Sequence, residues 1–308
     1  MKRLAPLLVL AAAVLWGVNG LFVAPLQDAG LSGTQITCTR FIAAATGAFA
    51  ICAAKRCSLR IGSLRDATWF ALNGVAGVFL FGLFYTYAIQ ATGMATAAVL
   101  IYLMPSFVMA FSVFTRREPC TARKVLCLAM SLLGCALVSD VAAPGASVAP
   151  VGVLFGVLAA LFYACNNIVQ AGPLARYEPA TVSAWSMLFG ALAATVHAGF
   201  CGELPSMATL FAARPDALGV NVVYGLVCSL VTFLLYNTAL RYLPVSQAAI
   251  LATFEPVAAA VLGFVVLGQG VTPAMLVGMS FEVAALVVLQ LPSRAGSKGV
   301  RRCSSPIL

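Results

Sequence analysis

Glu255 is the side chain whose position in the sequence most clearly suggests chemistry. It stands directly before Pro256, near the middle of an apolar stretch that is long enough to cross a membrane. A carboxyl group at that depth costs at least about 2.5 kcal/mol, so it must be paired, protonated or hydrated. It could contact a substrate ammonium group or carry a coupling proton, or it could hydrogen-bond to a neighbouring helix. Glu282, an acid in the last apolar stretch, is a second candidate for proton coupling.

Two prolines also fall inside apolar stretches. Pro105 and Pro256 each lie near the middle of such a stretch. Proline removes a backbone donor and frees the carbonyl group four residues earlier. Within lipid, the freed groups must be satisfied by protein or by water in a cavity. The prolines therefore predict two bent helices, which either line a substrate path or are kinks that serve packing alone.

Aromatic and amide side chains recur at helical spacing. Trp16 and Asn19 are three residues apart, as are Tyr163 and Asn166, and residues three apart share one face of a helix. Each pair could form a wall of a binding site, or the amides could tie helices together by hydrogen bonds. The same two interpretations apply to four further side chains in apolar stretches: Tyr85, Tyr102, Tyr236 and Asn237.

Arg40 is the one basic side chain well inside an apolar stretch, about a third of the way along it. Its guanidinium group could contact a substrate carboxylate. Alternatively, it could extend to the outer membrane interface or pair with the end of a helix.

The elements that position these residues must be membrane helices. Hydrophobic residues make up 62% of the chain and charged residues 9%, whereas a soluble domain carries about 25% charged residues. A helix that crosses the hydrocarbon core needs about 20 mostly apolar residues. The sequence therefore predicts an all-α polytopic membrane protein with ten spans: 4–26, 33–54, 67–89, 94–114, 122–138, 151–171, 180–200, 218–240, 246–267 and 273–292.

The net charge of +9 reflects topology and does not indicate a nucleic-acid partner. With ten spans and a cytoplasmic N-terminus, 16 of the 18 basic residues lie in inside segments. Only Arg40 and Arg214 fall on the outer side. This bias is the one that the positive-inside rule predicts. We therefore expect a multi-pass protein of the plasma (inner) membrane with both termini in the cytoplasm.

The two halves of the chain resemble each other. An offset of 151 residues relates like residues of two segments, namely Tyr85 to Tyr236, Pro105 to Pro256 and Thr121 to Thr272. Because five spans precede the second half, its helices would run opposite to their partners, as in an inverted-topology repeat. The predicted units are a first repeat at 5–138, a second at 151–291 and a basic cytoplasmic tail at 293–308.

Several short motifs, in order, resemble a known family. They are LWGVNGLF near the start, Glu118-x-x-Thr121, and EPVAAAVLG at 255–263. Together they are similar to the EamA-type family of the drug/metabolite transporter superfamily. The resemblance implies ten helices around a central cavity and transport of amino acids, sugars, nucleosides or drugs. Gln269 stands where the family usually has Glu, and the acid at Glu282 has no family counterpart.

What the sequence lacks narrows the function further. There is no G-x-x-x-x-G-K-[ST] loop to bind nucleotide phosphates. No cluster of residues has metal-ligand spacing, and His197 is the only histidine. We therefore expect no catalytic residue, no metal and no cofactor. With the resemblance above, we expect a secondary transporter that exports a small polar metabolite or an amino acid by alternating access. The alternatives are an integral-membrane enzyme or a membrane protein that does not transport, and the chain could be a monomer or a homodimer.

The charge bias predicts the position of the segment between the two halves. A reporter placed near position 145 should be outside the membrane barrier, and reporters at either terminus should be in the cytoplasm. Cysteine-accessibility labelling checks both. If position 145 were labelled from the inside, the ten-span topology and the inversion of the repeat would both be wrong.

Overall fold

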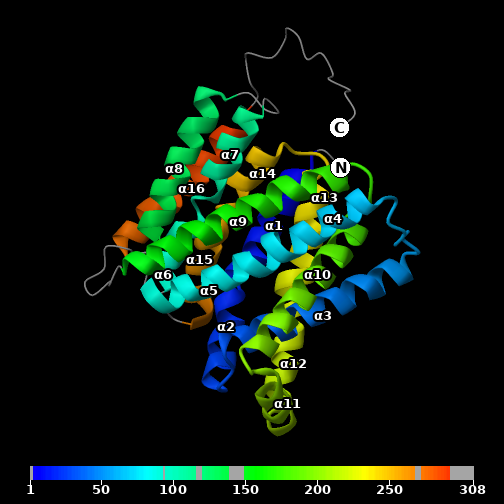
Figure 1. Cartoon of the computed structure of the whole chain (residues 1–308). Coiled ribbons are helices and arrows are strands. Elements are labelled where there is room, and N and C mark those ends of the chain that lie inside the picture. The colour runs from blue at the N-terminus through cyan, green and yellow to red at the C-terminus, as the bar shows by residue number, and fades with distance from the viewer. Residues whose placement is uncertain (1–2, 93, 116–119, 139–148, 268–271, 292–308) are drawn as a thin grey trace.

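The computed structural model describes residues 3–92, 94–115, 120–138, 149–267 and 272–291. Within these ranges every regular element is a helix and no strand occurs (Figure 1). Three sets of residues named in the sequence analysis lie outside the described residues: the pair Glu118 and Gln269, position 145 and the tail 293–308. The all-helical class is confirmed.

The helices of the first half follow the predicted spans closely. They are α1 (Ala5–Gly17), α2 (Asn19–Asp28), α3 (Gly33–Ala54), α4 (Leu64–Leu72), the π-helix η1 (Asn73–Leu80), α5 (Phe81–Thr92), α6 (Met94–Ile101), α7 (Met104–Phe114) and α8 (Ala122–Val138). Local signals fix several starts. Ser32 forms a capping box with Gln35 at the start of α3, and Ser63 caps α4.

The second half follows a similar order, with one unbroken first helix in place of two and with one added short helix. It consists of α9 (Pro150–Leu174), α10 (Pro179–Phe200), α11 (Leu204–Ala213), α12 (Pro215–Tyr224), the π-helix η2 (Gly225–Val231), α13 (Thr232–Leu240), α14 (Val245–Ala252), α15 (Glu255–Leu267) and α16 (Pro273–Gln290). The short helix α11 was not predicted from the sequence, because its ten residues are too few to form a span.

Eight helical segments are long and apolar enough to cross a membrane. The remaining predicted spans, 122–138 and 273–292, are the helices α8 and α16, of 17 and 18 residues. Both lie near the lower limit of about 17 residues for a helix that crosses a membrane. A multi-pass helical membrane protein is therefore confirmed, whereas ten crossings remain a prediction.

The interruptions of the long helices follow the same offset as the sequence match. The break between α6 and α7 falls at Tyr102 and Leu103, and the break between α14 and α15 falls at Thr253 and Phe254, 151 residues later. The π-helix η1, shifted by 151 residues, covers 224–231, and η2 covers Gly225–Val231. Matched breaks are what an internal repeat would produce. The opposite orientation of the two halves stays a prediction.

The first helix of each half packs against the other half. α1 lies along α13, α14 and α15, and α9 lies along η1, α5, α6 and α7. Gly17 shows how closely α1 approaches α15, since an added Cβ there would come 2.8 Å from the Ala259 nitrogen. The two halves are therefore interlocked around α1 and α9.

Two further helix pairs complete the packing. α3 packs along α10, and α8 packs along α16, as Figure 1 shows for the latter pair at one side of the molecule. Gly134 and Gly278 form the contact between α8 and α16, because a Cβ added at Gly278 would lie 2.7 Å from the carbonyl oxygen of Gly134. Only glycine permits this approach of the two backbones.

Polar contacts join the loops at the end where α4 begins. Arg176 pairs with Asp66 at 2.5 Å, and the Tyr177 hydroxyl donates to the same carboxylate at 2.7 Å. That hydroxyl also accepts from the backbone N–H of Gly62. Burial and the hydrogen bond to Asp66 raise the pKa of the Tyr177 hydroxyl. Arg241 donates to the carbonyl oxygen of Tyr177 at 2.8 Å.

Polar contacts also join the opposite end of the molecule. Ser32 hydrogen-bonds to Glu203, and the Gln35 side-chain amide donates to the Ser206 hydroxyl at 3.0 Å. They connect the start of α3 to the segment around α11.

The glycine contact between α8 and α16 gives a test of the packing. Gly278→Ala should lower the free energy of unfolding by about 1–3 kcal/mol, because the new methyl group must displace backbone atoms. Gly219→Ala is the matched control, since nothing lies within 4 Å of its added Cβ and the site is helical. Denaturant titration of both variants in detergent measures the difference. Equal stability of the two would show that α8 and α16 do not meet at this glycine.

Candidate functional site

Glu255 begins α15 directly after the break in the long helix, with Pro256 beside it. The backbone of α1 passes close by, because an added Cβ at Gly17 would lie 3.1 Å from the carbonyl oxygen of Glu255. The break removes regular helical hydrogen bonds at this point, which is tolerated at membrane depth only where protein or a hydrated space covers the backbone. The carboxyl group therefore lies at an irregular point of the backbone inside the helix assembly.

Four phenol groups lie in the neighbourhood of the carboxyl group of Glu255. The hydroxyl of Tyr102, at the break between α6 and α7, hydrogen-bonds to it. Tyr85 on α5, Tyr163 on α9 and Tyr224 on α12 lie close enough to interact with it electrostatically. The side chain keeps part of its surface accessible although protein atoms surround it. The arrangement offers hydrogen bonds and one negative charge in a largely aromatic setting.

Aromatic rings connect these phenols into a wall. The ring of Trp16 lies 6.3 Å from that of Tyr163 and 5.5 Å from that of Tyr236. Phe81 stacks on Tyr163 at 4.5 Å and on Tyr85 at 6.0 Å. Trp16 on α1 and Tyr163 on α9 thus meet in space.

Most of the predicted amide side chains are occupied in joining helices. Asn166 donates to the carbonyl oxygen of Gly77 at 2.9 Å, and Asn237 donates to the hydroxyl of Ser183 at 2.9 Å. The Tyr236 hydroxyl donates to the side-chain oxygen of Asn167. These contacts favour the interpretation that Asn166, Asn237 and Tyr236 hold the helices together.

Asn19 differs from those amides. It begins α2, directly after the break at Val18, and its side-chain oxygen is buried without a hydrogen-bond partner among the described residues. It therefore remains a candidate for contact with a bound molecule. Pro105 and Pro256 are both buried and both stand in the first turn of a helix that follows a break. The interruptions that the prolines predicted are present.

Glu282 lies between α16 and α8 and is fully buried. The Cys135 thiol donates to its carboxyl group at 2.9 Å, and the hydroxyls of Ser131 and Thr253 donate at 3.2 Å. Thr253 belongs to the break that precedes Glu255. A network of hydrogen bonds therefore links Glu282 to the backbone segment that carries Glu255.

Two residues that the sequence analysis did not single out also border the site. Tyr224 accepts a hydrogen bond from Arg40 at 2.6 Å, and Asn221 lies one turn before it on α12, fully buried. Their spacing of three residues within an apolar helix is the same signal that identified Trp16 and Asn19. The signal was present in the sequence.

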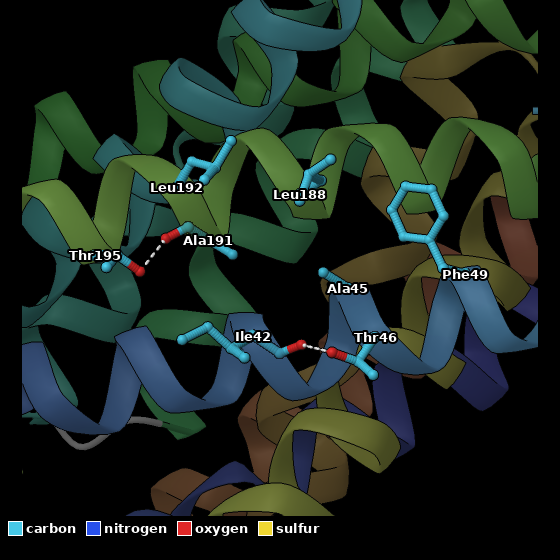
Figure 2. A pocket seen from close by; sticks show the side chains of 8 residues that line it. All are labelled: Ile42, Ala45, Thr46, Phe49, Leu188, Ala191, Leu192 and Thr195. Carbon is cyan, nitrogen blue, oxygen red and sulfur yellow. Dashed lines mark hydrogen bonds between the residues drawn. The ribbon is translucent and has the colours of Figure 1, made fainter. Parts of the chain in front are cut away.

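Two hollows of the described surface lie away from Glu255. The first, of about 380 Å³, runs between α3 and α10 and is shown in Figure 2. Its lining is apolar apart from Thr46 and Thr195, whose hydroxyls bond to carbonyl groups of their own helices. The second, of about 180 Å³, lies near Ser32 and Glu203. A polar ligand requires convergent polar groups, which the first hollow does not provide.

Among the residues that the structure describes, no group of three or more His, Cys, Asp or Glu side chains could hold a metal ion. The phenols and the carboxyl group at Glu255 can bind a polar or cationic group by hydrogen bonds and charge. The chemistry available is recognition of a small molecule.

Comparisons with known proteins identify transporters as relatives of this chain. The profile of the EamA-like transporter family matches residues 3–140 and 150–291. A protein of Salmonella typhimurium, described as an uncharacterized inner membrane transporter YicL, is 25% identical over 93% of this chain and 95% of its own length. A probable terminal-alkyne amino-acid exporter of Streptantibioticus cattleyicolor is 26% identical over 85% of this chain and 83% of its own length.

A solved structure shows the same fold. A protein of known crystal structure superposes with a TM-score of 0.78 over 94% of this chain and 97% of that chain. The two sequences are 20% identical.

The tie between Tyr236 and Asn167 gives a test of which side chains are structural. Tyr236→Phe should lower the free energy of unfolding by about 1–3 kcal/mol, because it leaves a buried amide oxygen without its donor. Tyr242→Phe is the control, since the Tyr242 hydroxyl makes no hydrogen bond within the described residues. Thermal melting in detergent compares them. Two equal melting temperatures would contradict the structural role of Tyr236.

Proposed function

The chain belongs to the EamA-like transporter family, and we propose that it is a secondary transporter that exports a small polar metabolite or an amino acid. The observation that carries the proposal is the carboxyl group of Glu255 among four phenols, at the break of a membrane helix. An ionisable residue at membrane depth indicates a functional site by default. The relative from Streptantibioticus cattleyicolor, described as a probable amino-acid exporter, supports this substrate class and direction.

The site suits a molecule with a positively charged amine. Glu255 supplies the negative charge, and the hydroxyls of Tyr85, Tyr102 and Tyr163 can accept or donate hydrogen bonds around it. Aromatic faces also attract cations, and the attraction grows as water is removed. Trp16 and Phe81 close the wall behind these phenols.

Alternating access is supported by how the long helices are broken and how their ends are held. The breaks at 102–103 and 253–254 can act as hinges, since the backbone N–H groups there bond to carbonyl groups three residues earlier, as in tight turns, and the regular α-helical pattern is interrupted. The contacts of Asp66 at one end, and of Ser32 and Glu203 at the other, are few and polar. Opening either end exchanges these contacts for water and leaves the apolar core intact. An inverted repeat would make the two openings equivalent.

Proton coupling is the energy source that the two acids support. Glu255 faces the proposed site, and Glu282 is joined through Thr253 to the same break. A change of charge on either carboxyl group would alter the hydrogen bonds that hold this hinge. We assign the coupling role to Glu255 and treat Glu282 as the residue that positions the hinge.

An integral-membrane enzyme is the second candidate function. The relatives are described as transporters, and the donor set around Glu255 lacks the base and nucleophile pair that hydrolytic chemistry needs. Substrate-dependent flux through proteoliposomes distinguishes the two functions directly.

The role of Glu255 is tested by one isosteric change. Glu255→Gln should keep the fold and the melting temperature while nearly abolishing flux, because glutamine keeps the size of the side chain but can neither ionise nor release a proton. Flux into proteoliposomes, normalised to folded protein and measured across a pH series, checks this. Glu178→Gln, on the loop before α10, is the matched control and should transport normally. Wild-type flux with an unchanged pH profile in the Glu255 variant would leave that residue with a structural role only.

A further inference from the structure

We infer that Arg40, Tyr224 and Asn221 form a carboxylate-binding half of the substrate site, facing the amine-binding half at Glu255, so that the protein selects zwitterions over amines. This inference rests on the proposed transport function and names the substrate feature that the site reads. It assigns to Arg40 one of the two roles that the sequence left open.

Arg40 is a guanidinium group inside the helix assembly without an acidic partner. One of its terminal nitrogens donates to the Tyr224 hydroxyl at 2.6 Å, and the guanidinium carbon lies 5.0 Å from the centre of the Tyr224 ring. Its Nε is buried without a hydrogen-bond partner, and no ion pair joins Arg40 to any acid in the described part of the chain. A guanidinium group is always charged and its fork of N–H donors matches a carboxylate. Arg40 therefore keeps donors and charge available.

The guanidinium group of Arg40 lies against neighbouring helices. The carbonyl oxygen of Arg40 lies against Gly225 on η2, where an added Cβ would come within 2.4 Å. A second terminal nitrogen faces Gly82 on α5, 3.9 Å from an added Cβ. The guanidinium group thus lies between α3, α5 and α12, on the side of the assembly that carries Tyr85 and Tyr224.

Asn221 provides an independent indication of a ligand. It is fully buried, one helical turn before Tyr224, and both atoms of its side-chain amide lack a hydrogen-bond partner among the described residues. A buried amide without partners is costly, so water or a bound molecule must satisfy it in the working protein. The other buried amides on this wall, Asn166 and Asn237, each donate to a neighbouring helix. Asn221 is therefore free to receive a ligand.

The charged groups of Arg40 and Glu255 lie near the same side chains but do not pair with each other. Arg40 and Glu255 both act electrostatically on Tyr224 and on Cys228, one turn further along. They nevertheless form no ion pair. Two unpaired opposite charges that border the same side chains match a molecule that carries both charges itself. An α-amino acid places its carboxylate and its ammonium group on one carbon atom and satisfies both halves together.

Three related compounds test the carboxylate half. L-leucine carries both charges, leucinamide has lost the carboxylate charge, and isoamylamine has lost the carboxyl group. The triplet of L-phenylalanine, phenylalaninamide and phenethylamine repeats the comparison with an aromatic side chain. Purified wild-type protein should bind the better of the two amino acids about tenfold or more tightly than its amide and its amine, as measured by thermal shift and by direct titration.

Two variants separate binding from folding. Arg40→Gln should remove the preference for the amino acid over the amine while binding of the amine stays unchanged. Asn221→Leu keeps the branched shape of the side chain and removes an unpartnered amide, so its melting temperature should be equal to that of wild type or higher. Its affinity for the amino acid should nevertheless fall about tenfold. Arg214→Gln, at an exposed pair with Asp216, is the control and should bind as wild type does.

The outcomes distinguish the inference from the proposed function. Equal binding of amino acid and amine by wild type, or unchanged selectivity in both Arg40→Gln and Asn221→Leu, overturns the carboxylate site. No binding of any of the six compounds also overturns it. Flux of uncharged nucleosides or sugars through proteoliposomes would then still support transport, whereas absence of flux for every class tested would contradict the proposed function itself.

Discussion

The requirement that every polar group inside the membrane find a partner shapes the whole structure. Lipid offers no hydrogen bonds, so a free amide, hydroxyl or carboxyl group must meet protein, water or ligand. The chain meets this requirement mostly by ties between helices, such as Asn73 to Ser186 and Asn237 to Ser183. Six side chains of the described residues keep a buried polar atom without a partner. Asn73, Gln170 and Asn237 still donate hydrogen bonds through the amide nitrogen. The other three are Asn19 on α2, Arg40 on α3 and Asn221 on α12. The buried polar side chains thus fall into two groups: those that join helices to one another and those that are available to bind a ligand.

The breaks in the helices follow from the same requirement. A break exposes backbone groups, so it is stable only where other polar groups cover it. Tyr102 lies at one break and bonds to Glu255, which follows the other. Thr253 at the second break bonds to Ser131 and Glu282. The irregular backbone and the candidate site therefore occupy the same place for one physical reason.

A structural feature could be predicted from the sequence when it depends on residues that are close to one another in the chain. Runs of apolar residues are local, so the positions of the helices and the class of protein followed from composition and spacing. The breaks at Pro105 and Pro256 were also local, because proline acts on its own backbone. The roles of the amides were not local. Asn166 and Asn221 look alike in sequence, yet Asn166 meets the backbone of η1 at Gly77, whereas Asn221 meets no partner. The role of Glu282 similarly depends on its hydrogen bonds with Ser131 and Cys135, which are more than a hundred residues away in the chain.

The interlocked packing of α1 and α9 bears on the order in which the chain is synthesised. α1 is made well before the helices that cover it, α13, α14 and α15. Until those helices are made, Trp16 lacks its neighbours Phe233 and Tyr236, and contacts so distant in sequence form slowly. α9 is made after α5, α6 and α7 and can dock at once. The first half of the chain therefore reaches its native environment only when the second half is made, and the midpoint of the chain is not a boundary of folding.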